Sequence, residues 1–458
     1  MRHTGFPTTL LKWLIPGMRV KRWLGLLLAG VTLLALGLAL VVVEIYRNYP
    51  LPAAIQSTAT LVTLQHVPRL VRAAVVGGAG LLLVAAGLVG FNRSLLGAVG
   101  TQSAQELVAL VDRRRRLGVG PKIVAIGGGT GLATLLRGLK EHTSNLTAIV
   151  TVADDGGSSG RLRRSLGVHP PGDFRQCIAA LADTEPLMES LFQYRFGDGE
   201  LEGHAFGNLF IVAMTGITGS FESALQASSR VLKVRGRIVP STLEHVTLFA
   251  ELEDARILAG ESQVPHGQAP IRRVFLEPPD APAYPDAVAA VLDADLVVLG
   301  PGSLYTSVLP NLLVGDIARA VTSTAAAVVY VANVATQPGE TDGYGLAEHL
   351  VALHRHLPAL ALDWVLANAN LTRSLPPAWR VTAVRPELVP KRALELTSEQ
   401  PLRWVPELAQ EHAQELPAEG QALAATLVKA DLVDEARPTR HDPAKLGAAV
   451  VGLLGRRG

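Results

Sequence analysis

Hydrophobic positions near the start of this chain form two long uninterrupted runs. Residues 23–43, WLGLLLAGVTLLALGLALVVV, and residues 73–91, AAVVGGAGLLLVAAGLVGF, contain no charged side chain. A helix needs about 20 apolar residues to cross the hydrocarbon core of a bilayer. Because a second run follows the first, a cleaved signal peptide is disfavoured. We predict two transmembrane helices, which make residues 1–92 a membrane hairpin.

Positive charge near these runs predicts their orientation. Five Lys or Arg residues precede the first run, without an acid among them, and three lie in the 44–72 segment between the runs. Cytoplasmic flanks carry the excess of Lys and Arg. We therefore expect a multi-pass protein of the inner (plasma) membrane, with both ends and the large C-terminal domain in the cytoplasm.

The pattern changes after residues 93–120, which are predicted to form a basic helical connector. From residue 121, short β-branched runs such as KIVAIG, LTAIV, ADLVVLG and AAVVYV alternate with helical spacing, as in Leu132, Leu135, Leu136 and Leu139. This alternation is typical of a parallel sheet with helices on both faces. We predict one Rossmann-like α/β domain over residues 121–458.

Ligands of open parallel sheets bind beyond the carboxyl ends of the strands, and a glycine loop occupies such a place after the first strand. It runs Gly127, Gly128, Gly129, Thr130, Gly131 and leads into a helix, whose amides and positive end suit a phosphate. Leu132 breaks the G-x-G-x-x-G fingerprint, which disfavours an NAD-dependent oxidoreductase. The alternative interpretation of the loop is a tight structural turn.

A second polar loop, ADDGGSSGRLRR, follows the next strand. Asp154 and Asp155 are candidates for a ribose hydroxyl or, alternatively, for Mg²⁺. Ser158, Ser159 and Arg161 can donate hydrogen bonds to phosphate oxygens.

The helix predicted after Pro170-Pro171-Gly172 begins with a further candidate acid. Asp173 is either a ligand-site residue or an N-cap whose capping-box partner is Gln176.

Two more strand-end loops carry candidate binding groups. The segment GHAFGNL contains His204 and Asn208, and His204 is either a ligand contact or a hydrogen-bonded structural residue. The loop GPGSLYTS supplies Gly300, Gly302, Ser303 and Thr306, and Gln337 to Thr341 add neutral hydrogen-bonding groups. Together these loops favour a nucleotide or another phosphorylated ligand.

Charge and cysteine content narrow the function further. The net charge of +2 gives no field that would select nucleic acid. The single cysteine, Cys177, excludes an intramolecular disulfide and fits a reducing compartment. We interpret Cys177 as a small buried residue on a helix.

Six motifs in order resemble a known family: KIVAIGGGTGLATLLRGLK, VTVADDGGSSGRLR, PPGDFRQC, GHAFGNL, GPGSLYTSVLPNLLV and RHDPAKL. They are similar to the YvcK-type gluconeogenesis factors of the CofD-like superfamily, which is named for 2-phospho-lactate transferase. The resemblance implies a Rossmann-like domain that binds a UDP-sugar, particularly UDP-N-acetylglucosamine, and a role in carbon flux, cell-wall synthesis and cell shape. It also makes Arg175 and Arg440 candidate ligand contacts, Arg440 for a diphosphate; otherwise Arg440 is a surface arginine before a helix capped by Asp442.

The chain departs from that pattern by its two predicted spans and by Phe174 before Arg175. Two functions remain open: a membrane-anchored UDP-sugar sensor without turnover that acts on a protein partner, or a phosphoryl-group transferase in which Asp154 or Asp155 positions Mg²⁺. We expect no nucleic-acid partner and a homo-oligomeric assembly.

Overall fold

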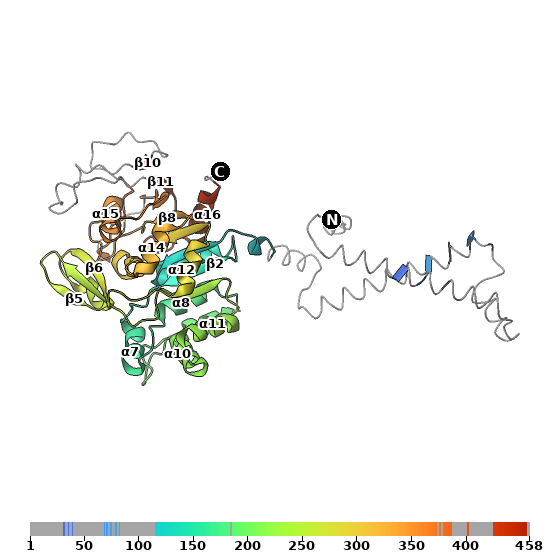
Figure 1. Ribbon diagram of the computed structural model, residues 1–458, viewed down its shortest axis with the longest axis horizontal. Helices are drawn as coiled ribbons and strands as arrows, with labels where there is room; N and C mark the ends of the chain where they lie inside the picture. Colours follow the sequence, from blue (N-terminus) through green and yellow to red (C-terminus); the bar gives the residue numbers. More distant parts are fainter. Residues whose placement is uncertain are drawn as a thin grey trace. The chain divides into compact units, whose positions relative to one another are not determined.

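The computed structural model of the chain divides into two compact units, Met1–Arg114 and Arg115–Gly458. The structure describes residues 115–183, 186–372, 375–376, 379–386, 401–402 (backbone only) and 425–455, together with single residues between Val31 and Leu82. Figure 1 draws these parts as coloured ribbon.

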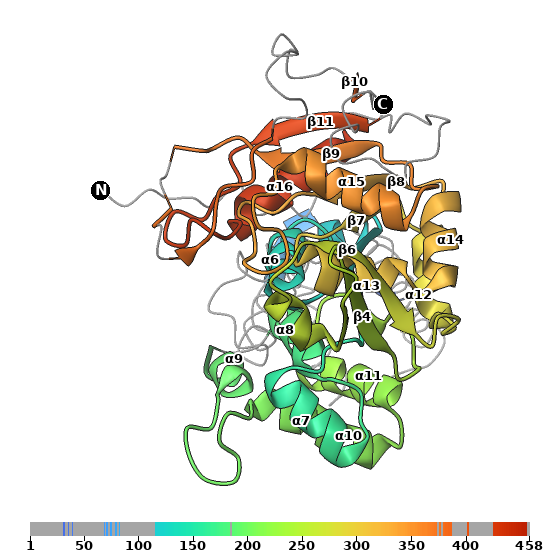
Figure 2. The ribbon, with the colours of Figure 1, turned by 90° about the vertical axis from the view of Figure 1, so that its left-hand side faces the viewer.

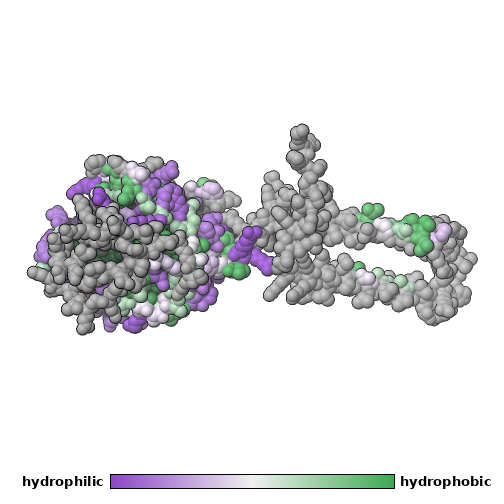
Figure 3. Space-filling model, turned by 90° about the horizontal axis from the view of Figure 1, so that it is seen from above, coloured by the Kyte–Doolittle hydropathy of each residue, from purple (hydrophilic) through white to green (hydrophobic). Residues whose placement is uncertain are grey.

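The two predicted membrane spans lie almost entirely outside the described residues. Within the part of the chain that the structure describes, no helix is both long enough and apolar enough to cross a membrane. The few described residues of the first unit are uncharged and exposed, among them Leu70 (87%) and Leu82 (72%), and they include the green atoms of that unit in Figure 3. The hairpin therefore stays a prediction.

The second unit is built on an eight-stranded sheet with the order β10-β11-β9-β8-β7-β1-β2-β3. All neighbouring strands are parallel except β10 and β11. This confirms the predicted Rossmann-like sheet. Its strands are β1 (Ile123–Gly127), β2 (Leu146–Val150), β3 (Arg237–Pro240), β7 (Leu296–Leu299), β8 (Ala327–Val331), β9 (Trp364–Asn368), β10 (Pro401–Leu402) and β11 (Ala425–Ala430).

Two groups of helices cover the sheet. α6 (Gly129–Leu139) packs against α8 (Gly172–Leu181) and α16 (Pro443–Leu454), whereas α12 (Pro285–Leu292) packs against α14 (Gly315–Ser323). The chain leaves β1 toward β2 but leaves β7 in the opposite direction, toward β8. Because such crossovers are right-handed, the two groups lie on opposite faces of the sheet, as Figure 2 shows.

The remaining helices extend this framework. They are α7 (Gly157–Leu166), α9 (Pro186–Gln193), α10 (Phe206–Thr218), α11 (Phe221–Val231), the π-helix η2 (Leu304–Val308), α13 (Leu309–Leu312) and α15 (Leu346–His356). Of the predicted connector, residues 93–120, the structure describes only the last six residues, and residues 115–118 are helical.

A small second sheet, antiparallel and three-stranded, was not predicted from the sequence. β4 (Thr247–Leu252) pairs antiparallel with β5 (Ile257–Ala259) and with β6 (Ile271–Glu277), and its side chains alternate between half-buried and buried. The 3₁₀ helix η1 (Glu261–His266) follows β5.

The core lies on both sides of the central strands. Every residue of β1, β7 and β8 is buried, as are Leu132, Leu135, Leu136 and Leu139 of α6. Cys177 is buried on α8, as predicted. Phe174, which departs from the family pattern, fills the core edge-to-face with Phe221, with 4.9 Å between ring centroids.

Candidate functional site

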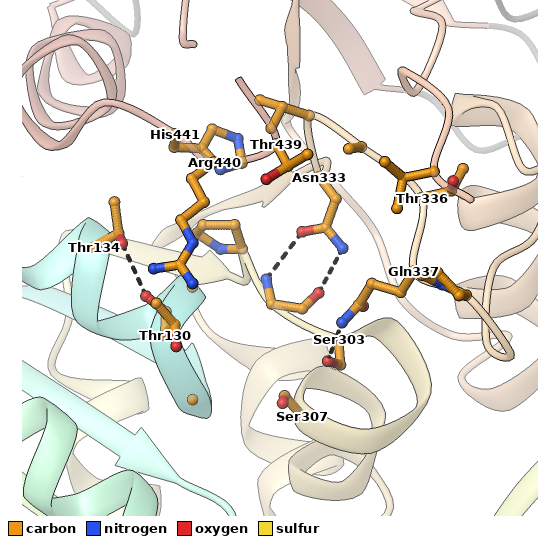
Figure 4. Close-up of a pocket in the computed structure, with 18 of the residues that line it drawn as sticks. Thr130, Thr134, Ser303, Ser307, Asn333, Thr336, Gln337, Thr439, Arg440 and His441 are labelled. Atoms are coloured by element: carbon orange, nitrogen blue, oxygen red, sulfur yellow. Dashed lines mark hydrogen bonds between the residues drawn. The ribbon is translucent and has the colours of Figure 1, made fainter. Parts of the chain in front are cut away.

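A cavity of about 520 Å³ opens at the carboxyl ends of β1, β7 and β8. This is where the chain reverses direction along the sheet, the usual ligand position in such folds. Its size lies within the range of small-molecule sites, about 300–1,000 Å³. The lining residues, most of which Figure 4 draws, are Gly128 to Gly131, Thr134, Pro301 to Ser303, Ser307, Asn333 to Pro338, Trp379, Val381 and Thr439 to His441.

The glycine loop forms one wall, where α6 begins. Gly128 precedes the helix in an extended conformation and provides no side-chain cap, and the first turn holds no acid. Gly129 has φ +60°, a backbone conformation that favours glycine. This end of α6 lines the cavity, which places the positive end of the helix dipole there, together with the amides other than that of Gly129, which bonds Asp173; such an arrangement binds phosphates.

The glycine loop and the Gly300-Pro301-Gly302-Ser303 loop meet backbone to backbone. A Cβ atom on Gly131 would lie 2.5 Å from the Pro301 carbonyl oxygen and 2.7 Å from Gly302 Cα. Asn333 clamps the second loop: its Oδ1 accepts from Gly302 N at 3.1 Å and its Nδ2 donates to Gly302 O at 2.8 Å. The two loops are thus fixed against each other before any ligand enters.

The opposite wall carries hydrogen-bonding side chains from the loop after β8. Gln337 Nε2 donates to Ser303 Oγ at 2.6 Å, while Gln337 Oε1 is buried without a partner among the described residues. Thr306 points elsewhere and donates to the buried carboxylate of Glu340 at 3.2 Å.

Segments far along the chain close the cavity. Trp379 lines it with about half of its surface exposed (49%). Figure 4 shows the Arg440 side chain extended across the cavity toward Thr130 at the start of α6. The Arg440 guanidinium is exposed and forms no ion pair within the described residues, so it is free for an anion. His441 is buried, and burial lowers its pKa to about 4, which keeps it neutral.

Asp173 does not cap its helix, which corrects one of the two interpretations. α8 begins at Gly172 with Pro171 as the N-cap residue, and no side chain caps it. The Asp173 carboxylate instead accepts a hydrogen bond from the Gly129 amide, and Gln176 Oε1 accepts one from Thr130 Oγ1 at 3.0 Å. The local sequence resembles a capping box, but the side chains of Asp173 and Gln176 bond the glycine loop at the start of α6 instead of their own helix.

Asp154 and Asp155 do not line this cavity. Asp154 accepts from Gly156 N at 2.9 Å and from the Ser159 hydroxyl, and burial raises its pKa. Asp155 Oδ1 accepts from Ser262 N at 2.8 Å. Within the described ranges, no group of three His, Cys, Asp or Glu side chains is placed to hold a metal ion. The ribose and Mg²⁺ roles of these two acids thus have no support from the cavity geometry.

His204 and its predicted partners form a hydrogen-bonded network behind the acid loop. Ser158 Oγ lies 3.0 Å from His204 Nδ1 and accepts from Asn208 Nδ2 at 3.0 Å. Arg175 Nε donates to Asn208 Oδ1 at 2.9 Å, and its guanidinium also reaches Gln193. This network ties together α7, α8, α9 and α10 and lies outside the cavity.

The structure therefore divides the predicted site residues. It brings together Gly128, Gly129, Thr130, Gly131, Gly302, Ser303 and Arg440 around one cavity. Gly127, Gly300 and Thr306 stand behind these loops, and Arg161 donates to the Glu202 carbonyl on the surface. Asn333, Trp379 and His441 also line the cavity but were not predicted from the sequence. The position of Asn333 just after the buried strand β8 could have indicated a ligand-site residue.

Carboxyl groups gather close to the glycine loop. Burial, reinforced by Asp154, raises the pKa of Asp173 to about 7. Burial likewise raises the pKa of Glu261 to about 8, with repulsion from Asp154 and Asp173, and that of Glu340 to about 7. These carboxyls change charge near neutral pH, which makes the electrostatic potential beside the cavity sensitive to pH.

Comparison with known proteins gives consistent relatives. The family described as 2-phospho-L-lactate transferase CofD matches residues 123–378. The gluconeogenesis factor of Bacillus subtilis is 51% identical over 255 residues, covering 56% of this chain and 80% of its own length. A relative from Deinococcus radiodurans, provisionally given the same name, is 39% identical over 450 residues, 96% of this chain and 89% of its own.

A solved structure supports the same assignment. A UPF0052 family member from Bacillus halodurans has a TM-score of 0.62 and 38% identity, and the match covers 72% of this chain and 99% of that one. The likeness therefore extends over the whole of that protein.

Proposed function

This chain belongs to the 2-phospho-L-lactate transferase CofD family and to its gluconeogenesis factors, and from that premise we propose that it is a regulator that binds a UDP-sugar, with UDP-N-acetylglucosamine as the leading ligand. The observation that carries the proposal is the open end of α6 facing the unpaired Arg440 across one cavity. We further propose that ligand binding controls a protein partner in carbon metabolism or cell-wall synthesis.

The diphosphate would lie between α6 and Arg440. Backbone amides and a helix N-terminus stabilise phosphate oxygens, and an arginine adds charge-assisted hydrogen bonds. Both are present on facing walls, while the close contact of Gly131 with Gly302 holds the amides in place.

The uridine and sugar would use the neutral wall. Trp379 offers an aromatic face to a base, and the Ser303 and Ser307 hydroxyls offer hydrogen bonds to a sugar.

The first prediction concerns affinity. Calorimetric titration of the chain with UDP-N-acetylglucosamine should give saturable binding without product, and Arg440→Ala should weaken it about tenfold because one charge-assisted contact is lost. Arg319→Ala, which removes an exposed charge on α14, is the matched control. Preference for GDP or NAD, or equal binding by both variants, would contradict the proposal.

The second candidate function is a phosphoryl-group transferase, because the family is described by a transferase activity. A phosphoryl transferase of this kind would need Mg²⁺ near the diphosphate, and no carboxylate is among the described residues that line the cavity. We derive no catalytic step for it. Sustained conversion of the bound nucleotide in the same titration would favour the transferase over the regulator.

We also propose that residues 1–92 anchor the protein in the inner membrane, with the second unit in the cytoplasm. Support comes from the two uncharged runs and from the flanking positive charges. The second prediction is that the full chain sediments with membranes and resists extraction by high salt, whereas a chain beginning at Arg115 does not. Release of the full chain by salt alone would count against the anchor.

A further inference from the structure

A second cavity, of about 380 Å³, lies between α7 and the start of β4. Its lining residues are Asp155, Gly160, Arg163, Arg164, Gly167, His245 and Thr247, none of which lines the first cavity. Two guanidinium groups and an imidazole thus converge on one hollow with a single acid.

The positive charge here is not balanced by ion pairs. Within the described residues, Arg163 Nη2 donates to the Val246 carbonyl at 2.6 Å and Arg164 Nη1 lies 3.4 Å from the Asp155 carbonyl, but neither forms a salt bridge. The Asp155 carboxylate is already engaged by the Ser262 amide at 2.8 Å. Both guanidinium groups keep donors available for an anion.

Histidines extend the basic lining. The exposed His245 stacks on His169 with 4.4 Å between ring centroids. His169 is buried, and its Nδ1 has no partner within the described part of the chain. Burial lowers the pKa of His169 to about 4, so its imidazole is neutral at neutral pH. The positive charge of the cavity therefore comes from Arg163 and Arg164, and His245 adds a ring nitrogen that can form a hydrogen bond with an anion.

A simpler role accounts for only part of this arrangement. Arg163 and Arg164 lie in the last turn of α7, where positive charge stabilises the helix dipole. That role explains their charge, but not the convergence with His245 and Thr247 from another element on a hollow. The donors suit the three oxygens of a phosphate group, and the volume leaves room for an attached organic group.

We propose that this second cavity binds a small phosphate monoester, separately from the UDP-sugar cavity. Arg163, Arg164 and His245 hold the phosphate oxygens, Thr247 adds a hydroxyl, and the organic group fills the rest of the hollow.

The test is calorimetric titration of the full-length chain with phenyl phosphate and with inorganic phosphate. Phenyl phosphate should bind at least as tightly as inorganic phosphate, and Arg164→Ala and His245→Ala should each weaken it about tenfold through the loss of one charged contact. Arg319→Ala, which changes an arginine outside both cavities, should bind as the unchanged chain does. Circular dichroism of each variant shows whether its fold is retained.

Three results would overturn the proposal. If the unchanged chain bound neither phenyl phosphate nor inorganic phosphate, the second cavity would not be a phosphate site. Loss of binding in Arg440→Ala, with Arg164→Ala unaffected, would place the phosphate in the first cavity. Binding of inorganic phosphate alone would exclude the monoester. Arg163→Lys, which keeps the charge, should retain more affinity than Arg163→Ala, and equal loss in both would indicate a packing role for Arg163.

Discussion

At the scale of single residues, the Asp173 carboxyl lies against the N-terminal end of α6, where we propose that the diphosphate binds. A Cβ atom on Gly128 would lie 2.4 Å from Asp173 Oδ2, so the carboxyl and the loop are in direct contact. With a pKa of about 7, Asp173 is partly protonated at neutral pH. A diphosphate bound beside it would repel the ionised form and favour the protonated one.

The third prediction follows from that contact. Affinity for UDP-N-acetylglucosamine should fall as pH rises through 7, because the ligand binds the protonated form better, by at most about tenfold per pH unit for one linked proton. Asp173→Asn should bind nearly independently of pH between 6.5 and 8.5, measured by calorimetry. Glu340→Gln is the control, because it removes a carboxyl with a similar pKa that bonds Thr306 and not the glycine loop. If the affinity of Asp173→Asn fell with pH as steeply as that of the unchanged chain, a group other than Asp173 would cause the pH dependence.

At the scale of elements, the packing of α6 on α16 links both walls of the cavity. The helices touch at glycines: a Cβ atom on Gly138 would lie 2.0 Å from the Pro443 carbonyl oxygen and 3.0 Å from Gly447 Cα. Arg440 and His441 lie directly before α16, whose N-cap Asp442 accepts from Lys445 N at 2.8 Å, as predicted. The position of Arg440 therefore depends on this helix contact.

The fourth prediction tests the contact. Gly138→Ala should lower the free energy of unfolding by about 1–3 kcal/mol, as overpacking does, and should weaken UDP-sugar binding as α16 moves away. Chemical denaturation and calorimetry measure the two effects. Gly452→Ala, on α16 with no atom within 4 Å of the added methyl group, should leave binding unchanged and should not lower the free energy of unfolding, because alanine favours a helix over glycine. Normal binding by a destabilised Gly138→Ala would show that Arg440 does not depend on α16.

At the scale of the whole molecule, buried carboxyls make stability depend on pH. The folded pKa values of Asp173, Glu261 and Glu340 lie above their unfolded values. Their stabilising contribution is full below pH 4 and is lost as pH rises through 7 to 8. Buried His169 and His441, with pKa values of about 4, act in the opposite sense, but only below about pH 6.5.

The fifth prediction is a loss of stability between pH 7 and 9. The free energy of unfolding should fall by roughly 1–2 kcal/mol over this range, and Glu261→Gln should reduce the fall because Glu261 has the highest pKa of the three. Urea denaturation at several pH values measures it. Constant stability from pH 7 to 9 would show that these carboxyls titrate normally.

Local patterns in the sequence were enough for the central framework. Continuous apolar runs predicted β1, β2, β7 and β8, because a strand buried on both faces is apolar at every position. Leucines at helical spacing predicted α6, because a helix buried along one stripe is apolar at every third or fourth position. The capping role of Asp442 was also predictable, since a cap bonds within its own turn. The glycine loop, the Gly302-Ser303 loop and Arg440, which the sequence analysis assigned to one ligand site, line one cavity.

Only the tertiary structure decided which polar residues share the cavity. Asp173 carries the local signature of a cap but contacts the glycine loop, and Asp154 and Asp155 end a strand yet bond to their own loop and to Ser262. Trp379 enters from a segment far from the strands. Sequence determines the elements because their periodicity is local, whereas the direction of a polar side chain depends on partners that only the folded chain brings near.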